Sequence, residues 1–196
     1  ASNGFRLARD LLRRPVVRAA MLTTAIGHGL MILVMNATPL AMSFCGLSLE
    51  TSAEVIRWHM LGMFLPAFVA GPLVDRLGST RMALLGCLVL VISAAVALCG
   101  LSQWYFLISS FLLGLGWNLL MVAGTTLLAQ GHDAEERGHA QGLMELGNGL
   151  VAACASFASG ALISNLGWSA LNIAMLPLLA IALLMLPARK RQPITG

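Results

Sequence analysis

The feature that most constrains the fold is a pair of long stretches without lysine or arginine, one between Arg81 and Arg137 and one between Arg137 and Arg189. Over the whole chain of 196 residues, 10% are charged and 58% are hydrophobic. A soluble domain has about 25% charged residues, because its entire surface faces water. These stretches therefore cannot form the surface of a soluble globule, and they predict segments that cross a lipid bilayer.

Six segments are long and apolar enough to cross a membrane as helices. An α-helix rises 1.5 Å per residue, so about 20 mainly apolar residues are needed to cross roughly 30 Å of hydrocarbon. Alternation with a period of two is weak, which disfavours a β-barrel, and each connection contains a helix breaker or a polar cluster. The sequence therefore predicts an all-α membrane protein with six transmembrane helices at residues 20–43, 53–74, 82–99, 104–130, 139–164 and 168–186.

Eleven of the twelve basic residues fall on one side of these predicted spans. They precede the first span, follow the sixth, and occupy the second-to-third and fourth-to-fifth connections, whereas Arg57 alone lies on the other side. By the positive-inside rule, both the N-terminus and the C-terminus are expected in the cytoplasm. The net charge of +4 is explained by this orientation, so we predict no nucleic-acid partner.

No residue cluster in the sequence indicates a catalytic centre, a metal or a cofactor. The cysteines lack CxxC spacing and lie in or beside apolar runs, where they are expected to be small core residues: Cys45, Cys87, Cys99 and Cys154. His132 and His139 flank three acidic residues, but the arrangement is too loose for a metal site. A Walker motif is also missing from the sequence, so this chain is not expected to hydrolyse ATP.

The connection between the second and third predicted spans carries a distinctive motif, GPLVDRLGSTR at residues 71–81. Gly71 would let two backbones approach closely, and Gly78 would permit a tight turn into the next helix. Asp75 and Arg76 would be held at the membrane interface, where the carboxylate can pair with an arginine or face the positive N-terminus of another helix. An ordinary helical hairpin whose basic residues mark the cytoplasmic side would explain the arginines. It would not explain the aspartate and the two glycines.

This motif resembles the signature loop of the major facilitator superfamily, G-x-x-x-D-R-x-G-x-x-R, which lies between the second and third helices of each six-helix half. Residues 58–68, 140–142 and 167–168 also resemble the second half of a bacterial drug-efflux-like branch. The resemblance covers nearly the whole chain. At residues 79–80 the family often has basic residues, so Ser-Thr here argues against a strong charge relay. The resemblance implies a gating loop of Gly71, Asp75, Arg76, Gly78 and Arg81.

The resemblance also implies how the chain is divided and what it meets. Residues 1–18 would be the remnant of a cytoplasmic linker, residues 19–188 a six-helix transmembrane half-domain, and residues 189–196 a cytoplasmic tail. This C-terminal half of a 6+6 bundle would join an N-terminal six-helix half of the same polypeptide, or a second copy. We therefore expect a multi-pass protein of the bacterial inner membrane, whose partners are the lipid bilayer and a small-molecule substrate.

Polar and flexible side chains recur at helical spacing in the first and fourth predicted spans. Polar groups at membrane depth are costly, so each is a candidate for function. In the family, the first and fourth helices of each half line the central cavity, and methionine and amide groups suit an adaptable substrate surface. The resemblance therefore implies a substrate cavity lined by Thr24, His28, Met31, Met35, Asn36, Asn118, Met121 and Thr125.

Two of these residues have an equally ordinary structural explanation. His28 can be a neutral histidine that packs against a neighbouring carbonyl, and Asn118 can join two helices through a hydrogen bond. Apart from Glu54 at the very start of the second span, Glu145 is the only carboxylate within a predicted span, and it can be a gating ion pair, a proton carrier or a side chain that reaches the interface. Glu145 and His28 are the candidates for proton coupling.

Taken together, these features predict secondary active transport of a small molecule by alternating access, with proton-coupled efflux as the expected direction. A non-transporting membrane receptor or scaffold on the same fold is the alternative. An intramembrane serine protease is disfavoured, because the sequence FASG at residues 157–160 lacks the glycine expected before the serine. In addition, no histidine within the membrane has an evident route to Ser159.

The orientation can be tested by labelling. If the basic residues mark the cytoplasm, a reporter fused after Gly196 will be cytoplasmic, and cysteines placed at Ser48 or Ser102 will react with an impermeant reagent from outside. Labelling of either position only after the membrane has been opened would contradict the predicted orientation.

Overall fold

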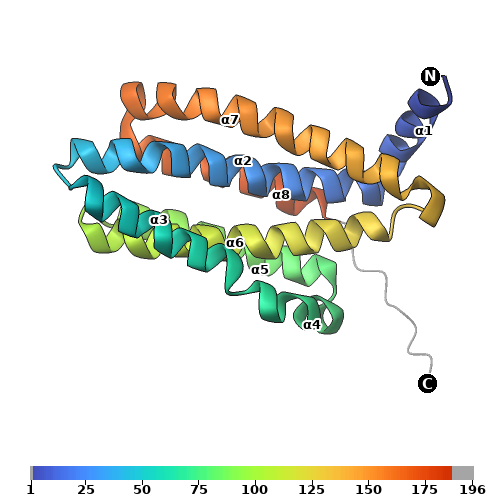
Figure 1. Ribbon diagram of the computed structural model, residues 1–196, viewed down its shortest axis with the longest axis horizontal. Coiled ribbons are helices and arrows are strands. Elements are labelled where there is room, and N and C mark those ends of the chain that lie inside the picture. The colour runs from blue at the N-terminus through green and yellow to red at the C-terminus, as the bar shows by residue number, and fades with distance from the viewer. Residues whose placement is uncertain (1, 187–196) are drawn as a thin grey trace.

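The computed structural model describes residues 2–186, and every regular element in this range is a helix. Figure 1 shows the long helices running side by side along one axis. The eight α-helices and the one 3₁₀ helix of the described residues are α1 (Ser2–Arg13), α2 (Pro15–Phe44), α3 (Leu49–Phe64), α4 (Ala67–Leu77), α5 (Ser79–Leu98), α6 (Gln103–Ala129), η1 (Ala134–Glu136), α7 (Arg137–Ile173) and α8 (Met175–Met185).

Four helices, α2, α5, α6 and α7, are long and apolar enough to cross a membrane, and α3 with α4 makes a fifth if the bent pair is one span. Hydrocarbon offers no partner for backbone polar groups, so a spanning segment must satisfy its own N–H and C=O groups as a helix. The expected all-α membrane architecture is confirmed. The count of six spans and the cytoplasmic termini remain predictions, and the predicted tail at residues 189–196 lies outside the described residues.

Local signals set several helix ends. Pro15 opens α2 at a position where a missing N–H costs nothing. The Ser48 hydroxyl accepts the N–H of Thr51 at 3.1 Å and caps α3. Gly46 and Gly78 have φ of 74° and 81°, a left-handed region that favours glycine, and they end α2 and α4.

The second predicted span, residues 53–74, is broken in the structure. α3 ends at Phe64, α4 begins at Ala67, and the two axes differ by 41°. Pro66 lies at this break, and because proline has no N–H it cannot continue the helical hydrogen bonding to the residue four positions earlier. The predicted second span is therefore a bent pair of helices rather than one straight helix.

The turn expected between the fifth and sixth predicted spans is found at Gly167, inside the range of α7. This residue has φ of 79° and ψ of 179°, so the chain turns sharply there. After the turn, the Trp168 indole N–H donates to the Ala97 carbonyl at 3.1 Å, and the Trp168 ring packs on Phe106 with centroids 5.0 Å apart. The predicted sixth span, residues 168–186, corresponds to the part of α7 after this turn together with α8.

α2 lies between α6 and α7 and packs along both, whereas α6 and α7 barely touch each other (Figure 1). α3 and α5 pack on α6, and α8 contacts α2 and α5. Figure 1 also places α1, the α4–α5 turn and the α6–α7 connection at the same end of the bundle. The arginines of these three segments therefore gather at one end, which we call the arginine end.

Glycines permit the closest helix contacts. A Cβ atom at Gly62 of α3 would overlap the Phe111 carbonyl of α6, and one at Gly114 of α6 would overlap the His59 carbonyl of α3. Without a hydrophobic driving force between helices in lipid, close van der Waals packing of this kind holds neighbours together.

We predict that Gly114→Ala destabilises the bundle. The added methyl group has to push α3 away from α6, and overpacking of a tight core typically costs about 1–3 kcal/mol. The thermal midpoint of the detergent-purified protein, followed by loss of the monodisperse peak on size exclusion, should fall. The matched control is Gly160→Ala, where nothing lies within 4 Å of the added Cβ. Equal midpoints for the two variants would contradict the role of Gly114.

Candidate functional site

A groove of about 510 Å³ opens between α6 and α7 at the arginine end. It exists because both helices pack on α2 but diverge from each other. The lining combines hydroxyl, amide, imidazole and guanidinium groups with aliphatic side chains, and consists of Thr125, Thr126, Leu128, Ala129, His132, Arg137, Gln141 and Met144. Of the residues predicted to line a cavity, this groove contains Thr125.

The polar groups of the groove are only partly engaged by the protein. The hydroxyls of Thr125 and Thr126 donate to carbonyls one turn earlier in α6, at 2.8 Å each, and keep their lone pairs for other partners. Arg137 and Gln141 are exposed. Neither of the two salt bridges found among residues 2–186 involves Arg137. The groove can therefore accept or donate hydrogen bonds to a polar ligand or to water.

His28 on α2 and Trp117 on α6 form a polar and aromatic pair. The Trp117 indole N–H donates to His28 Nδ1 at 3.3 Å, and the ring centroids are 6.2 Å apart at an interplanar angle of 44°. In a neutral imidazole this bond places the ring proton on Nε2. Met121, one turn after Trp117, is half-buried. The structure therefore brings the predicted residue His28 beside an indole that the predicted set omitted.

Nearer the opposite end, Asn36 joins α2 to α7. Its side-chain amide donates to the Ser156 hydroxyl at 2.9 Å, and both residues are exposed. Met35 is half-buried and packs against the main core. Asn36 and His28 are eight residues apart, which is about 12 Å along the helix. Polar side chains therefore extend from the arginine end along much of α2.

Other predicted cavity residues lie in helix interfaces. Thr24 is fully buried and packs against Gly124 of α6, and Met31 is buried. The Asn118 amide donates to the Met63 carbonyl of α3 at 2.9 Å and is buried, as the alternative of helix packing supposed. Helical spacing shows which residues share a face of a helix, but it does not show which neighbouring helix covers that face. The residues predicted to line the cavity therefore include some that lie in the contact between α2 and α6.

Glu145 is exposed on α7. It lies eight residues after the start of that helix, about 12 Å along its axis. Neither salt bridge within the described part of the chain involves it. A carboxylate at this depth needs water, a polar partner or a route to the interface.

The loop motif forms a tight turn between α4 and α5. The Gly78 N–H donates to the Val74 carbonyl at 2.8 Å, and its φ of 81° provides the expected reversal. Asp75 and Arg76 are exposed, and neither forms a salt bridge within residues 2–186. Within these residues nothing lies within 4 Å of a Cβ built at Gly71, so the close backbone approach expected there is not found.

An ion pair that the sequence did not indicate ties α2 to the α6–α7 connection. Both terminal guanidinium nitrogens of Arg14 donate to the Glu136 carboxylate, at 2.6 and 2.7 Å, and Nη1 also donates to the Gly131 carbonyl at 2.9 Å. Glu136 further accepts the N–H of Asp133. The Arg14 hydrogen bonds, followed by the bond from Asp133, lower the pKa of Glu136 to about 2. The partners are 122 residues apart, and neither has a motif that would reveal the pairing.

The serine of the FASG sequence has a structural role. The Ser159 hydroxyl donates to the Leu33 carbonyl of α2 at 2.7 Å, and the residue is fully buried. No histidine takes part in this bond, so the geometry offers no activated nucleophile.

Comparison with known proteins places these features in context. A family model described as Major Facilitator Superfamily matches residues 24–195. The riboflavin transporter RfnT of Brucella anthropi is 34% identical over 180 residues, covering 92% of this chain and 45% of that protein. The uncharacterised MFS-type transporters YdeG and YddS of Bacillus subtilis are 34% and 31% identical, covering 73% and 78% of this chain and 34% and 36% of their own lengths. The chain thus spans less than half the length of these relatives.

The Arg14–Glu136 pair should stabilise the fold in a pH-dependent way. Because the folded-state pKa of Glu136 is depressed to about 2, its contribution is complete above the ordinary carboxyl pKa of 4.5 and is lost as the pH falls towards 2. We expect Glu136→Gln to lower the thermal midpoint at pH 7 and to change it less at pH 3. Glu135→Gln, at an exposed neighbour, is the matched control. A fall of equal size in both variants would contradict a specific ion pair.

Proposed function

The chain belongs to the Major Facilitator Superfamily, and from this membership we propose that it forms one six-helix half of a secondary transporter for a small molecule in a bacterial inner membrane. The observation that carries the proposal is the row of partly engaged polar groups beside α2. It comprises the groove at Thr125 and Gln141, the His28–Trp117 pair and the Asn36–Ser156 bond.

Such a row is costly in contact with lipid. Each unsatisfied polar group in hydrocarbon costs several kcal/mol, so an irregular polar surface at membrane depth requires water or protein against it. A water-filled path along α2, closed by a second six-helix unit, removes this cost. Secondary transporters hold their substrate sites near the membrane midplane, between two such repeats.

The exposure of α7 far from the arginine end supports a partner against that part of the helix, where Leu150, Phe157 and Leu166 are 61%, 85% and 63% exposed. Within its most apolar stretch 17% of residues are buried, compared with 44% to 61% for the other three long spanning helices. Glu145 is exposed on the same helix. We propose that the partner is an N-terminal six-helix half of the same polypeptide, with a second copy of this chain as the variant.

Alternating access would then be a rocking of the two halves about the polar path. The turn at Gly78 presents Asp75 and Arg76 at the arginine end, where they can contact the partner half in one state and release it in the other. Glu145 and His28 are the proposed sites of proton coupling, because both can change charge next to this path. On this scheme the transport is proton-coupled efflux.

The relative RfnT is named a riboflavin transporter, which makes riboflavin the first substrate to test. The Trp117 indole offers a flat apolar surface, and the neighbouring His28 offers a ring nitrogen for a polar edge. Such a combination of an aromatic face and few polar groups suits a planar heteroaromatic molecule. A receptor or scaffold without transport is the alternative function.

The deciding experiment uses the natural gene product that contains this chain, purified and reconstituted in liposomes. We expect riboflavin flux above that of empty liposomes and a loss of up to about tenfold in Trp117→Ala, since an aromatic contact is worth about 0.5–1.5 kcal/mol. Trp58→Ala, at an exposed tryptophan of α3, is the matched control. Riboflavin that binds but does not cross would favour the receptor, and neither binding nor flux would refute the riboflavin assignment.

Energy coupling has its own prediction. Glu145→Gln should abolish accumulation driven by a proton gradient while sparing exchange of labelled for unlabelled substrate, because exchange needs alternation but no net proton movement. Glu135→Gln, in the α6–α7 connection, controls for loss of a carboxylate at the same end. Normal accumulation in Glu145→Gln would leave His28 as the remaining candidate on this chain.

A further inference from the structure

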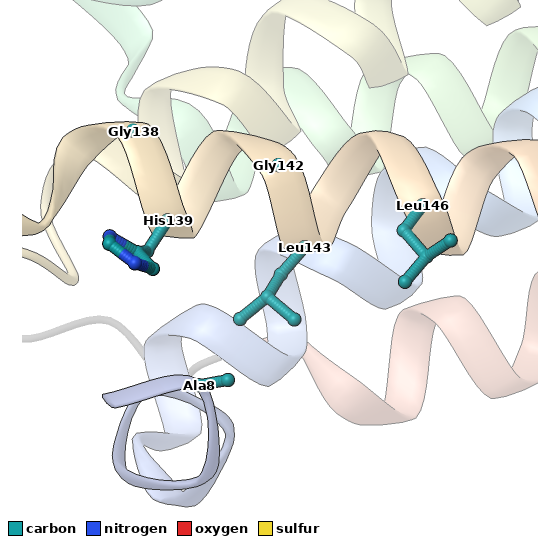
Figure 2. A pocket seen from close by; sticks show the side chains of 6 residues that line it. All are labelled: Ala8, Gly138, His139, Gly142, Leu143 and Leu146. Atoms are coloured by element: carbon teal, nitrogen blue, oxygen red, sulfur yellow. The ribbon is translucent and has the colours of Figure 1, made fainter. Parts of the chain in front are cut away.

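A second hollow lies away from the polar groove, in the angle between α1 and α7 (Figure 2). Its volume is about 420 Å³, and its lining residues are Ala8, Gly138, His139, Gly142, Leu143 and Leu146. Figure 2 shows Ala8 of α1 across from the His139 and Leu143 side chains of α7. Apart from the His139 imidazole, the side chains that line the hollow are apolar.

The floor of the hollow is not filled by the chain itself. Nothing lies within 4 Å of a Cβ built at Gly138 or at Gly142, so these glycines leave an open channel along α7. Leu146 is 61% exposed and continues the channel away from the arginine end. An apolar strip of this kind suits an extended hydrocarbon chain lying parallel to the helix.

α1 forms the other wall and is firmly attached to the bundle. Leu11 is fully buried in a cluster with residues of α2, α6 and α7. Phe5, Ala8 and Leu12 follow i, i+3, i+7 spacing and share one face of α1. Phe5 and Leu12 are exposed although they are large and apolar. The face of α1 that contains Ala8 therefore extends the apolar surface of the hollow outwards.

Arginines adjoin this apolar face. Arg6, Arg9 and Arg13 also follow i, i+3, i+7 spacing and are exposed. Asp10 is the one acidic residue among them, and it lies 3.9 Å from Arg13. A helix with a row of arginines beside an exposed apolar strip is typical of segments that lie in the membrane interface and attract anionic lipids.

We propose that the hollow is a binding site for an anionic phospholipid. One acyl chain lies along Gly138, Gly142 and Leu146, and the phosphate headgroup meets the arginine row of α1 with His139 beside it. The excess of positive charge selects this occupant, because a second copy of the chain would bring its own arginines to the same place and repel. The site would attach α1 to the bilayer, and it does not depend on which molecule is transported.

The test counts bound lipid. The natural gene product is delipidated in mild detergent and titrated with phosphatidylglycerol or with phosphatidylcholine carrying identical acyl chains, and bound lipids are resolved by native mass spectrometry. We expect preferential binding of one phosphatidylglycerol. Arg9→Gln should reduce that preference by about fivefold, the ratio equivalent to about 1 kcal/mol for a basic residue near an anionic surface. Arg57→Gln, at an exposed arginine of α3, should leave it unchanged.

A second variant tests the hollow itself. Gly142→Leu fills the channel without changing charge, and it should remove the tightly bound lipid of either headgroup. The control is Gly160→Leu, equally unobstructed and about 27 Å further along α7. Equal binding of the two lipids by the unmodified protein, a preference that survives Arg9→Gln, or unchanged retention in Gly142→Leu would each overturn the proposal. So would a change of oligomeric state in Gly142→Leu, which would assign the hollow to a second copy.

Discussion

The lack of hydrogen-bonding partners in hydrocarbon is the constraint on which the rest of the structure depends. It makes the chain helical. It also divides the polar side chains into those that are hydrogen-bonded within the bundle and those that are exposed. Ser159 bonds the Leu33 carbonyl and Ser93 bonds the Ser109 carbonyl, both buried at 2.7 Å, so these groups hold helices together. Asn36, Gln141 and Glu145 instead lie exposed on the sides of α2 and α7. Buried serines whose hydroxyls are already hydrogen-bonded can lie in the core or against lipid. The exposed amide and carboxylate groups require water or a partner protein against them.

The same constraint explains the contact at the broken span. Pro66 has no N–H to donate to the Gly62 carbonyl four residues earlier, and beside this break the Met63 carbonyl accepts the Asn118 amide. The bond costs Asn118 its freedom to contact a ligand. It also ties α6, which bears Trp117 and Thr125, to the bend between α3 and α4.

Much of the fold could be predicted from the sequence, because apolar length and breakers act locally. The turn at Gly78 and the clustering of arginines at one end followed directly. The break at Pro66 did not, since hydropathy stays high on both sides of it. The turn at Gly167 also followed from its helix breaker, whereas the Trp168–Ala97 bond just after it joins distant segments and could not be predicted. For the candidate site, helical spacing selected His28 and Thr125 as candidates. It also selected Thr24 and Asn118, because spacing alone does not show which residues of a helix are covered by a neighbouring helix. The Arg14–Glu136 pair arises only from the folded arrangement.

The central claim is that the polar side of α2 and α6 faces water rather than lipid. It can be tested with single cysteines in the natural gene product, after the native cysteines are replaced, using a membrane-impermeant thiol reagent that reacts only where water reaches. Cysteines at Asn36, Met121 and Thr125 should react from one side of the membrane or the other, whereas a cysteine at Leu88, exposed on the apolar α5, should not. Failure of all three polar-side cysteines to react, at a rate no higher than that at Leu88, would contradict a water-filled path.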